Sequence, residues 1–130
     1  MSVESNRQAL QGYLMEHDDS FLAEDAVFVD MSSGQEWKGR EAVRQMLDWF
    51  YHVAFDAKAE PVSLIVDEEH AAFEGNVVGK HIGEFAGVPP TNKEFRVPIT
   101  VMYDLADGRI TAGRIYFAVP ALMAQLGVSS

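Results

Sequence analysis

Carboxylates, histidines and tyrosines are the side chains of this sequence that could do chemistry, and Asp30 stands out by its surroundings. It follows the apolar run Ala26–Val29 and precedes Ser32-Ser33-Gly34, which is typical of a turn. A carboxylate that faces an apolar cavity is poorly solvated and becomes a stronger base toward a carbon acid or water. An Asp that ends a strand and begins a turn fits the same pattern. The residues alone leave both interpretations open.

Other kinds of site lack their defining residues. The sequence has no cysteine, which excludes disulfides, thiolate metal sites and cysteine nucleophiles. It also has no Gly-rich phosphate loop and no G-x-S-x-G turn. The polar clusters at 17–19 and 67–70 lack the spacing that puts metal ligands on one face. We therefore expect no metal and no cofactor, and we interpret both clusters as solvated turns.

Two helices are expected to position these residues from the N-terminal half. Leu10, Tyr13 and Leu14 share one stripe of a first helix that Ser5 or Asn6 would cap. A short strand is expected over 26–31. After Gly39, apolar residues recur at three- and four-residue spacing and predict a second helix on the core. They are Ala42, Val43, Met46, Leu47, Phe50 and Tyr51.

From residue 55 onward the pattern predicts strands, over about 55–66, 70–81, 94–104 and 109–119. Residues 83–93 contain two prolines and are expected to form a loop, and Asp107-Gly108 predicts a tight hairpin. The strand over 94–104 has one apolar face, made of Phe95, Val97, Ile99, Val101 and Tyr103. Helices followed by long antiparallel strands predict an α+β fold, in a single domain over 1–130.

The charge balance limits the partners. A formal net charge of -10 argues against binding nucleic acid or an anionic membrane surface. No apolar stretch approaches the ~20 residues that span a bilayer, and residues 1–7 lack the basic start and apolar run of a secretory signal. We expect a cytoplasmic protein whose partner is a small molecule, with no nucleic acid and no membrane.

Several motifs, in order, resemble SnoaL-like polyketide cyclases. Residues 79–93 resemble the loop G-x-H-x-G-x-F-x-G-x-P-P-T-G-K, with Asn92 in place of its last Gly. Residues 107–110 resemble D-G-K-I, and residues 121–127 resemble L-x-x-Q-L-G. Residues 39–43 are similar to the G-R-E-A-I of the wider nuclear-transport-factor-2-like superfamily. The resemblance covers nearly the whole chain.

The resemblance implies a cone-shaped, strongly curved antiparallel sheet, closed by N-terminal helices around a cavity of roughly a few hundred Å³. The superfamily includes aldol cyclases of aromatic polyketides, ketosteroid isomerases, limonene-type and polyether-type epoxide hydrolases, dehydratases and ligand carriers. Its members usually dimerise through the outer sheet face, so a homodimer is expected. The residues expected to bind an apolar substrate are Trp37, Phe50, Ile99, Val101, Tyr103, Ile115 and Phe117.

Three catalytic candidates also come from the resemblance. Residues 29–34 are similar to the E-D-P-V-G stretch that holds the general base of ketosteroid isomerases, which makes Asp30 the candidate base. Tyr13 occupies the first-helix place of the isomerase's oxyanion tyrosine. His81 matches the loop histidine, which could be a second acid/base or could hold the loop through a backbone hydrogen bond. The Asp of the antibiotic cyclases falls on Ile115, so aldol cyclisation through that Asp is not expected.

Three hypotheses follow for the function. The first is an enzyme of the cyclase or isomerase type, which uses carboxylate acid/base catalysis on an apolar polyketide-, steroid- or terpenoid-like metabolite. The second is a non-catalytic protein that binds an apolar ligand. The third is an epoxide hydrolase or epoxide-opening cyclase, in which Asp56 would pair with Asp30, although Asp56 and Glu60 also fit solvated positions.

Overall fold

The computed structural model describes residues 2–16 and 19–128 and begins with helix α1, Val3–Glu16. The helix starts earlier than predicted, because Ser2 Oγ accepts a hydrogen bond from the backbone N–H of Ser5 at 3.0 Å. Asn6 is fully buried instead of capping the helix. Its Nδ2 donates to the carbonyl oxygens of Asp67 and Glu68, at 3.0 and 2.8 Å. Asn6 thus ties α1 to the turn at residues 67–69.

Six strands form one mixed sheet in the order β2-β1-β6-β5-β4-β3. Their bounds are β1 Leu22–Asp30, β2 Glu36–Lys38, β3 Phe55–Val66, β4 His70–His81, β5 Glu94–Ala106 and β6 Arg109–Phe117. Neighbouring strands are antiparallel, as predicted, except that β1 and β6 are parallel. The all-antiparallel expectation is wrong at this pair, because the chain leaves β1 for the second helix and reaches β6 only at the end of the β3–β6 meander. The sheet is curved but not closed.

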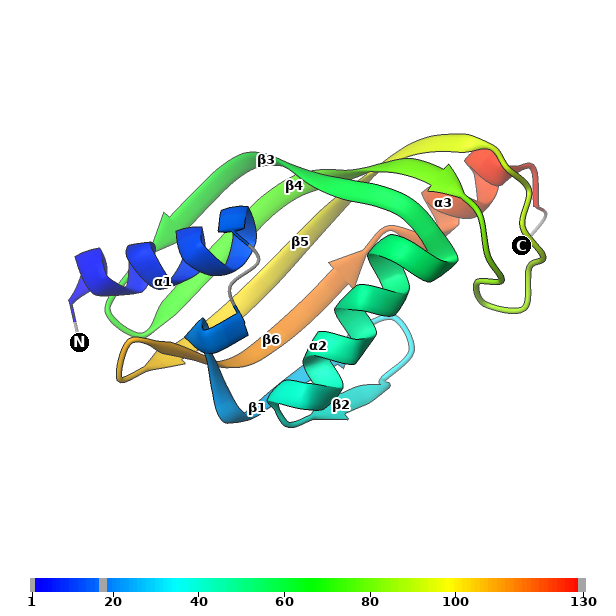
Figure 1. The fold of residues 1–130 in the computed structure, drawn as a ribbon. Helices are drawn as coiled ribbons and strands as arrows, with labels where there is room; N and C mark the ends of the chain where they lie inside the picture. The colour runs from blue at the N-terminus through cyan, green and yellow to red at the C-terminus, as the bar shows by residue number, and fades with distance from the viewer. Residues whose placement is uncertain (1, 17–18, 129–130) are drawn as a thin grey trace.

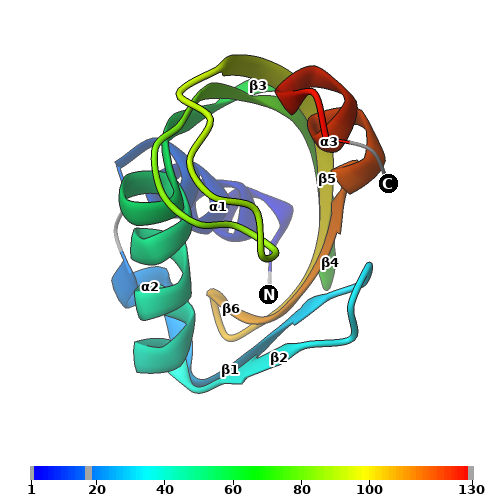
Figure 2. The same cartoon turned by 90° about the vertical axis from the view of Figure 1, so that its right-hand side faces the viewer.

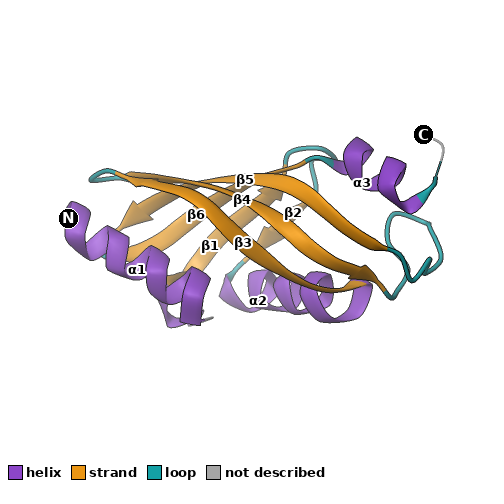
Figure 3. Cartoon of the chain, turned by 90° about the horizontal axis from the view of Figure 1, so that it is seen from above, coloured by secondary structure: helices purple, strands orange, loops and turns teal. Residues whose placement is uncertain are grey.

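The sheet bends around an interior that helices cover from one side (Figures 1 and 3). Helix α1 lies at one end, which we call the closed end, and α2 (Arg40–Asp48) lies farther along the same concave face (Figure 3). The loop 82–93 and α3 (Val119–Leu126) lie at the opposite end, which we call the mouth (Figure 1). A view into the mouth shows the loop in front of the opening, with α1 behind it (Figure 2).

Two short helical segments complete the elements. The 3-10 turn η1 (Asp19–Phe21) precedes β1, and the π-helical turn η2 (Trp49–Ala54) continues α2 directly into β3. Sequence periodicity predicted a single second helix and did not reveal this widening. No helix among residues 2–16 and 19–128 is long and apolar enough to cross a membrane.

The core lies on the concave face and follows the predicted alternation of β5. Its inward side chains are all buried: Phe95, Val97, Ile99, Val101 and Tyr103. The hairpin before β6 turns through Asp107 and Gly108 with φ of +54° and +73°, the left-handed geometry that the Asp-Gly pair favours. These observations confirm the predicted α+β fold.

Candidate functional site

Two adjacent rows of paired residues cross the concave face. In the first row Phe28 of β1 and Tyr103 of β5 lie on either side of Gly113 of β6, which pairs with both. In the second row, nearer the mouth, Asp30 pairs with Ile115. Rows on the same face are two residues, or about 7 Å, apart along a strand. The register therefore places Asp30 and Tyr103 in neighbouring rows of one surface.

Tyr13 of α1 packs onto the first row from the helix side. Its ring centroid lies 5.9 Å from that of Tyr103 and 6.3 Å from that of Phe28, both edge to face. Burial, reinforced by the neighbouring tyrosines, raises the pKa of Tyr13 and of Tyr103 well above the ordinary value. Both phenols therefore keep their protons at neutral pH and are hydrogen-bond donors.

Tyr51 of η2 belongs to the same group, which sequence reasoning placed only in the core stripe of the second helix. Burial raises its pKa to about 12. Its electrostatic interaction also contributes to the raised pKa of Tyr13 and of Tyr103. Its position beside Phe50 near the end of a helical stripe was the available sequence signal. We call Tyr13, Tyr51 and Tyr103 the tyrosine cluster.

The half-buried Asp30 carboxylate is held by the turn that follows β1. Oδ1 accepts hydrogen bonds from the backbone N–H and the hydroxyl of Ser32, at 3.0 and 2.7 Å, and Oδ2 accepts one from the Ser33 hydroxyl at 3.0 Å. An ionised carboxylate has about four lone-pair positions. One therefore remains on Oδ2, so Asp30 stabilises the turn and can still accept a proton.

An open hollow of about 390 Å³ adjoins Asp30 at the rim of the mouth. Its walls are Met31, Ser32, Tyr116, Phe117 and Ala118. The Ser32 hydroxyl, which donates to Asp30, is the link between this hollow and the carboxylate. The hollow thus lies beside the turn that holds the Asp30 carboxylate.

Aromatic rings pack together inside the mouth, where the resemblance implied a cavity. Phe50 of η2 is their centre, with ring centroids at 5.0 to 6.5 Å from those of Trp49, Tyr51, Phe55, Phe85 and Phe117. Phe85 belongs to the loop 82–93 and stacks on Trp49 at 6.0 Å. A molecule that enters through the mouth must therefore displace part of this packing, with Phe85 on the path.

The remaining candidate substrate-binding residues lie on the same inner surface. Ile99 and Phe117 pair across β5 and β6, and Val101 pairs with Ile115 one row away. Trp37 of β2 is half-buried and pairs with Phe28. The sequence did not single out Phe85, although the G-x-F of its loop motif contained it.

His81 is fully buried at the base of the loop 82–93. Its Nδ1 accepts a hydrogen bond from the backbone N–H of Thr91 at 3.2 Å and lies 3.1 Å from the Thr91 hydroxyl. This pairing leaves the proton of the neutral ring on Nε2, which has no partner. The arrangement favours the loop-holding interpretation over the acid/base one.

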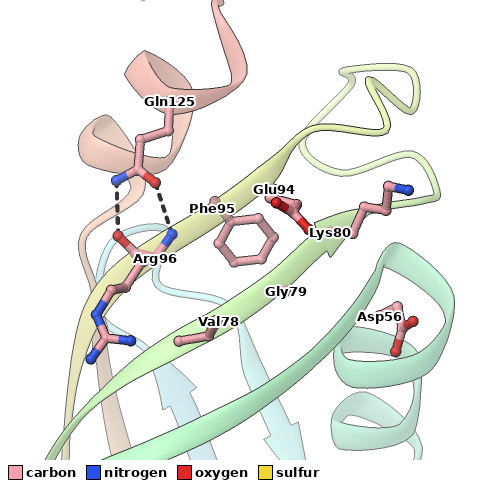
Figure 4. A pocket seen from close by; sticks show the side chains of 8 residues that line it. All are labelled: Asp56, Val78, Gly79, Lys80, Glu94, Phe95, Arg96 and Gln125. Atoms are coloured by element: carbon pink, nitrogen blue, oxygen red, sulfur yellow. Dashed lines mark hydrogen bonds between the residues drawn. The ribbon is translucent and has the colours of Figure 1, made fainter.

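Asp56 lies on the opposite face of the sheet from Asp30. It lines a convex-face hollow of about 600 Å³ together with Val78, Gly79, Lys80, Glu94, Phe95, Arg96 and Gln125 (Figure 4). Glu60 is also on this face and forms an ion pair with Arg96 at 2.6 Å. The carboxylate pair that an epoxide hydrolase would need from Asp30 and Asp56 is therefore not formed.

No metal site is present in the part of the chain that the structure describes, where no three His, Asp or Glu side chains gather as ligands. Asp67 Oδ1 accepts hydrogen bonds from the backbone N–H groups of Glu69 and His70, at 2.8 and 2.6 Å. This cluster is thus a turn, as interpreted from the sequence. His17 and Asp18 of the other cluster lie outside the described residues.

A sequence model of the SnoaL-like polyketide cyclases matches residues 4–126, nearly the whole chain. The chain belongs to the SnoaL-like polyketide cyclase family. No curated protein matches it. Family membership supports activity of the cyclase or isomerase kind.

Solved structures share the fold over almost their full lengths. One, from Jannaschia sp. CCS1, is described as a SnoaL-like polyketide cyclase; it has 17% identity and a TM-score of 0.86, over 98% of this chain and 95% of that one. IdmH from Streptomyces antibioticus, described as a polyketide cyclase, has 24% identity and a TM-score of 0.72, over 98% and 100%. A protein of Catenulispora acidiphila with a ketosteroid isomerase-like fold has 17% identity and a TM-score of 0.73, over 99% and 96%. At these identities the likeness shows the fold alone.

Proposed function

We propose that this SnoaL-like protein is an enzyme of the cyclase or isomerase type, which performs acid/base catalysis on an apolar polyketide-, steroid- or terpenoid-like molecule. One observation carries the proposal, the position of Asp30. Its side chain leaves the strand on the concave face, in the row next to Phe28 and Tyr103. Three hydrogen bonds to its carboxylate leave one lone pair free on Oδ2. A base and a set of buried phenols then face one ligand from adjacent rows.

In the proposed reaction Asp30 takes a proton from a carbon acid. Ser32 and Ser33 hold the carboxylate in one orientation, which lowers the entropic cost of proton transfer. Tyr13, still protonated, donates a hydrogen bond to the oxygen on which negative charge develops. His81 contributes indirectly, because it fixes the base of the loop that covers the mouth.

Non-catalytic binding of an apolar ligand is the second candidate. The observation that favours it is the set of three hydrogen bonds that engage Asp30 in its turn. Ile115 and Val101, which lie beside Asp30 across the sheet, are also apolar and add no further acid or base. A binding protein would need only the inner aromatic and aliphatic surface.

Turnover of a panel of apolar ketones, polyketide-like esters and epoxides, followed by mass spectrometry, separates the two candidates. The decisive variant is Asp30→Asn, and Asp56→Asn is its matched control because it makes the same change on the convex face. Loss of a general base should lower turnover by about 100-fold or more in Asp30→Asn only. Equal turnover in all three proteins would exclude the proposed base, and tight binding without conversion would favour the binding protein.

A further inference from the structure

The loop 82–93 carries Phe85 on a two-residue hairpin at its tip. The backbone N–H groups of Phe85 and Val88 each donate to the carbonyl oxygen of the other, at 3.1 and 2.8 Å. Ala86 and Gly87 between them have φ of +51° and +80°, the left-handed pair that tight hairpin turns favour. The tip is therefore a short unit with its own hydrogen bonds, and it adds the Phe85 ring to the aromatic packing of the mouth.

Backbone hydrogen bonds hold both ends of this loop at its base. At the first end the N–H groups of residues 82–83 donate to the carbonyl oxygen of Ala54, at 3.1 and 2.9 Å. At the second end the His81 N–H donates to the Lys93 carbonyl at 3.0 Å, and the His81 carbonyl accepts from the Asn92 N–H at 2.9 Å. His81 is therefore the residue on which the second end closes.

The His81 ring joins the second end through an acceptor nitrogen. Nδ1 accepts a hydrogen bond from the Thr91 N–H at 3.2 Å and lies 3.1 Å from the Thr91 hydroxyl, whose oxygen accepts from the Lys93 N–H at 3.3 Å. A backbone N–H can only donate, so Nδ1 serves the Thr91 N–H only while it carries no proton. When the ring takes a second proton, both ring nitrogens become donors and this hydrogen bond is lost.

The interior around the His81 ring offers no partner for a positive charge. The ring is fully buried, and Nε2 has no hydrogen-bond partner. Its neighbour on β3 is the Phe55 ring, at 5.5 Å between centroids. No carboxylate forms an ion pair with His81 in the part of the chain that the structure describes.

The charged groups of the surrounding elements are exposed or lie on the convex face. The adjacent row of paired residues is one residue away along each strand, and so on the convex face: Asp56, Lys80 and Glu94. The exposed groups of η2 and the loop are His52, Glu84 and Lys93. Helix α3 has no charged residue, and buried Tyr51 keeps its proton, because burial raises its pKa to about 12. A second proton on His81 is therefore a buried charge without a counter-charge while the loop is closed, and water stabilises that charge once the loop opens.

We propose that His81 makes the loop 82–93 a pH-sensitive lid of the mouth. The neutral ring accepts the Thr91 hydrogen bond and keeps Phe85 in the aromatic packing. The protonated ring cannot accept it, so the second end of the loop is released and the mouth opens as the pH falls from about 8 to about 5, the range in which histidines change charge. This inference goes beyond the proposed function, because an enzyme and a binding protein alike must let an apolar molecule past Phe85.

Trp49 supplies a reporter for the lid, because its ring stacks on that of Phe85 at 6.0 Å. The sequence has two tryptophans, so Trp37→Phe leaves Trp49 as the only one. As the pH falls from about 8 to about 5, quenching of its fluorescence by acrylamide should increase. The protection factor of the Thr91 amide in hydrogen exchange should fall by about tenfold over the same range, the value of one hydrogen bond. Circular dichroism at each pH verifies that the sheet stays folded.

His81→Asn is the decisive variant. Its amide oxygen can accept from the Thr91 N–H in place of Nδ1 and does not titrate, so the lid should stay closed and both signals should stay flat. His52→Asn makes the same change at an exposed histidine of η2 and should keep the native response. A response that persists in His81→Asn, a response lost in His52→Asn, or no response in the native background would overturn the lid proposal.

A second measurement in the native protein decides the matter if His81→Asn does not fold. Nitrogen NMR chemical shifts of the His81 ring should show an unprotonated Nδ1 at high pH, and its protonation should coincide with the loss of protection at Thr91. Protonation of the ring without that loss, or a loss that accompanies unfolding of the sheet, would contradict the lid. Asp30→Asn should keep the native response, so the lid and the proposed base are tested separately.

Discussion

Gly113 determines how closely the rings of the inner surface can pack. It lies between Phe28 and Tyr103 in the first row, on the strand that joins them. A Cβ atom at this position would lie 2.9 Å from two ring carbons of Phe28. The absence of a side chain is what allows the Phe28 ring to occupy this place beside Tyr13.

Gly113→Ala should therefore destabilise the protein by roughly 1–3 kcal/mol, because the Phe28 ring must shift within a packed core. Urea unfolding measures the change. Ala112→Ser is the control, since it adds one atom at the neighbouring position, on the other face of the strand. Unchanged stability in Gly113→Ala would show that the ring packing tolerates the methyl group.

Tyr51 adds a pH dependence to stability. Its folded-state pKa of about 12 lies above the ordinary 10.0, so the folded chain keeps a proton that the unfolded chain loses first. This contribution to stability is fully present below pH 10 and is lost as the pH rises toward 12. The free energy of unfolding in urea should fall over that window, and Tyr51→Phe should make the fall shallower. A slope identical in both proteins would contradict the burial of the Tyr51 hydroxyl.

At the scale of elements, Gln125 of α3 forms hydrogen bonds with backbone groups of β5 that no neighbouring strand pairs with. β6 ends opposite Ile99, so the β5 edge around Arg96 has no strand beside it there. The Gln125 side chain accepts a hydrogen bond from the Arg96 N–H at 2.8 Å and donates to its carbonyl at 2.9 Å (Figure 4). The Gln of the L-x-x-Q-L-G motif thus has a structural role in this chain, which is to hold α3 against β5.

Gln125→Ala should expose this edge. We expect faster hydrogen exchange at the Arg96 amide and a loss of about 1 kcal/mol in stability, the net value of the broken bonds. Ala124→Ser, at an exposed position on the same helix, is the control. An Arg96 amide that exchanges at the native rate in Gln125→Ala would show that α3 is held to β5 by other contacts.

Sequence patterns predicted the elements well where one physical signal dominated. The two-residue alternation of β5 and the Asp107-Gly108 turn follow from local preferences, and both are confirmed. The parallel β1–β6 pair depends on where the chain returns after the 78 residues between Asp30 and Arg109, which no local pattern encodes. The widening at Trp49–Ala54 was hidden because its apolar residues fit an ordinary helix as well.

For the same reason, only part of the candidate site could be predicted from the sequence. Asp30, Tyr13 and His81 were predicted as candidates from the resemblance, and the register brings Asp30 near the residues that Tyr13 contacts. The sequence could not show that Tyr51 acts electrostatically on Tyr13, because the position of Tyr51 depends on the π-helical turn. Nor could it show that Asp56 faces outward, since a strand's faces are assigned only when its register is known.

At the scale of the whole molecule, the convex face exposes apolar side chains that a single chain leaves uncovered. Ile65 is 67% exposed and Tyr116 46% exposed, and half-buried Met102 and Ala72 lie on the same face. Apolar side chains gathered on one sheet face are typical of an interface between subunits. We propose that this face joins two copies of the chain.

Charged substitutions on that face test the proposed dimer. Ile65→Asp combined with Tyr116→Asp should convert a dimer to a monomer in analytical ultracentrifugation, because two carboxylates would be buried without partners. Val53→Asp is the control, since Val53 is 55% exposed but belongs to η2, outside the convex face. A native protein that sediments as a monomer would contradict the proposal.

The most direct test of the account is exchange of the α-protons of 2-tetralone for deuterium in D₂O, followed by proton NMR. Asp30 as base, with the buried phenol donors beside the neighbouring row, should speed this exchange above the buffer rate. We predict that Asp30→Asn loses about 100-fold or more of the acceleration, that Tyr103→Phe loses a smaller part, and that Asp56→Asn loses none. Exchange at the buffer rate in the native protein, or equal acceleration in Asp30→Asn, would contradict the catalytic account.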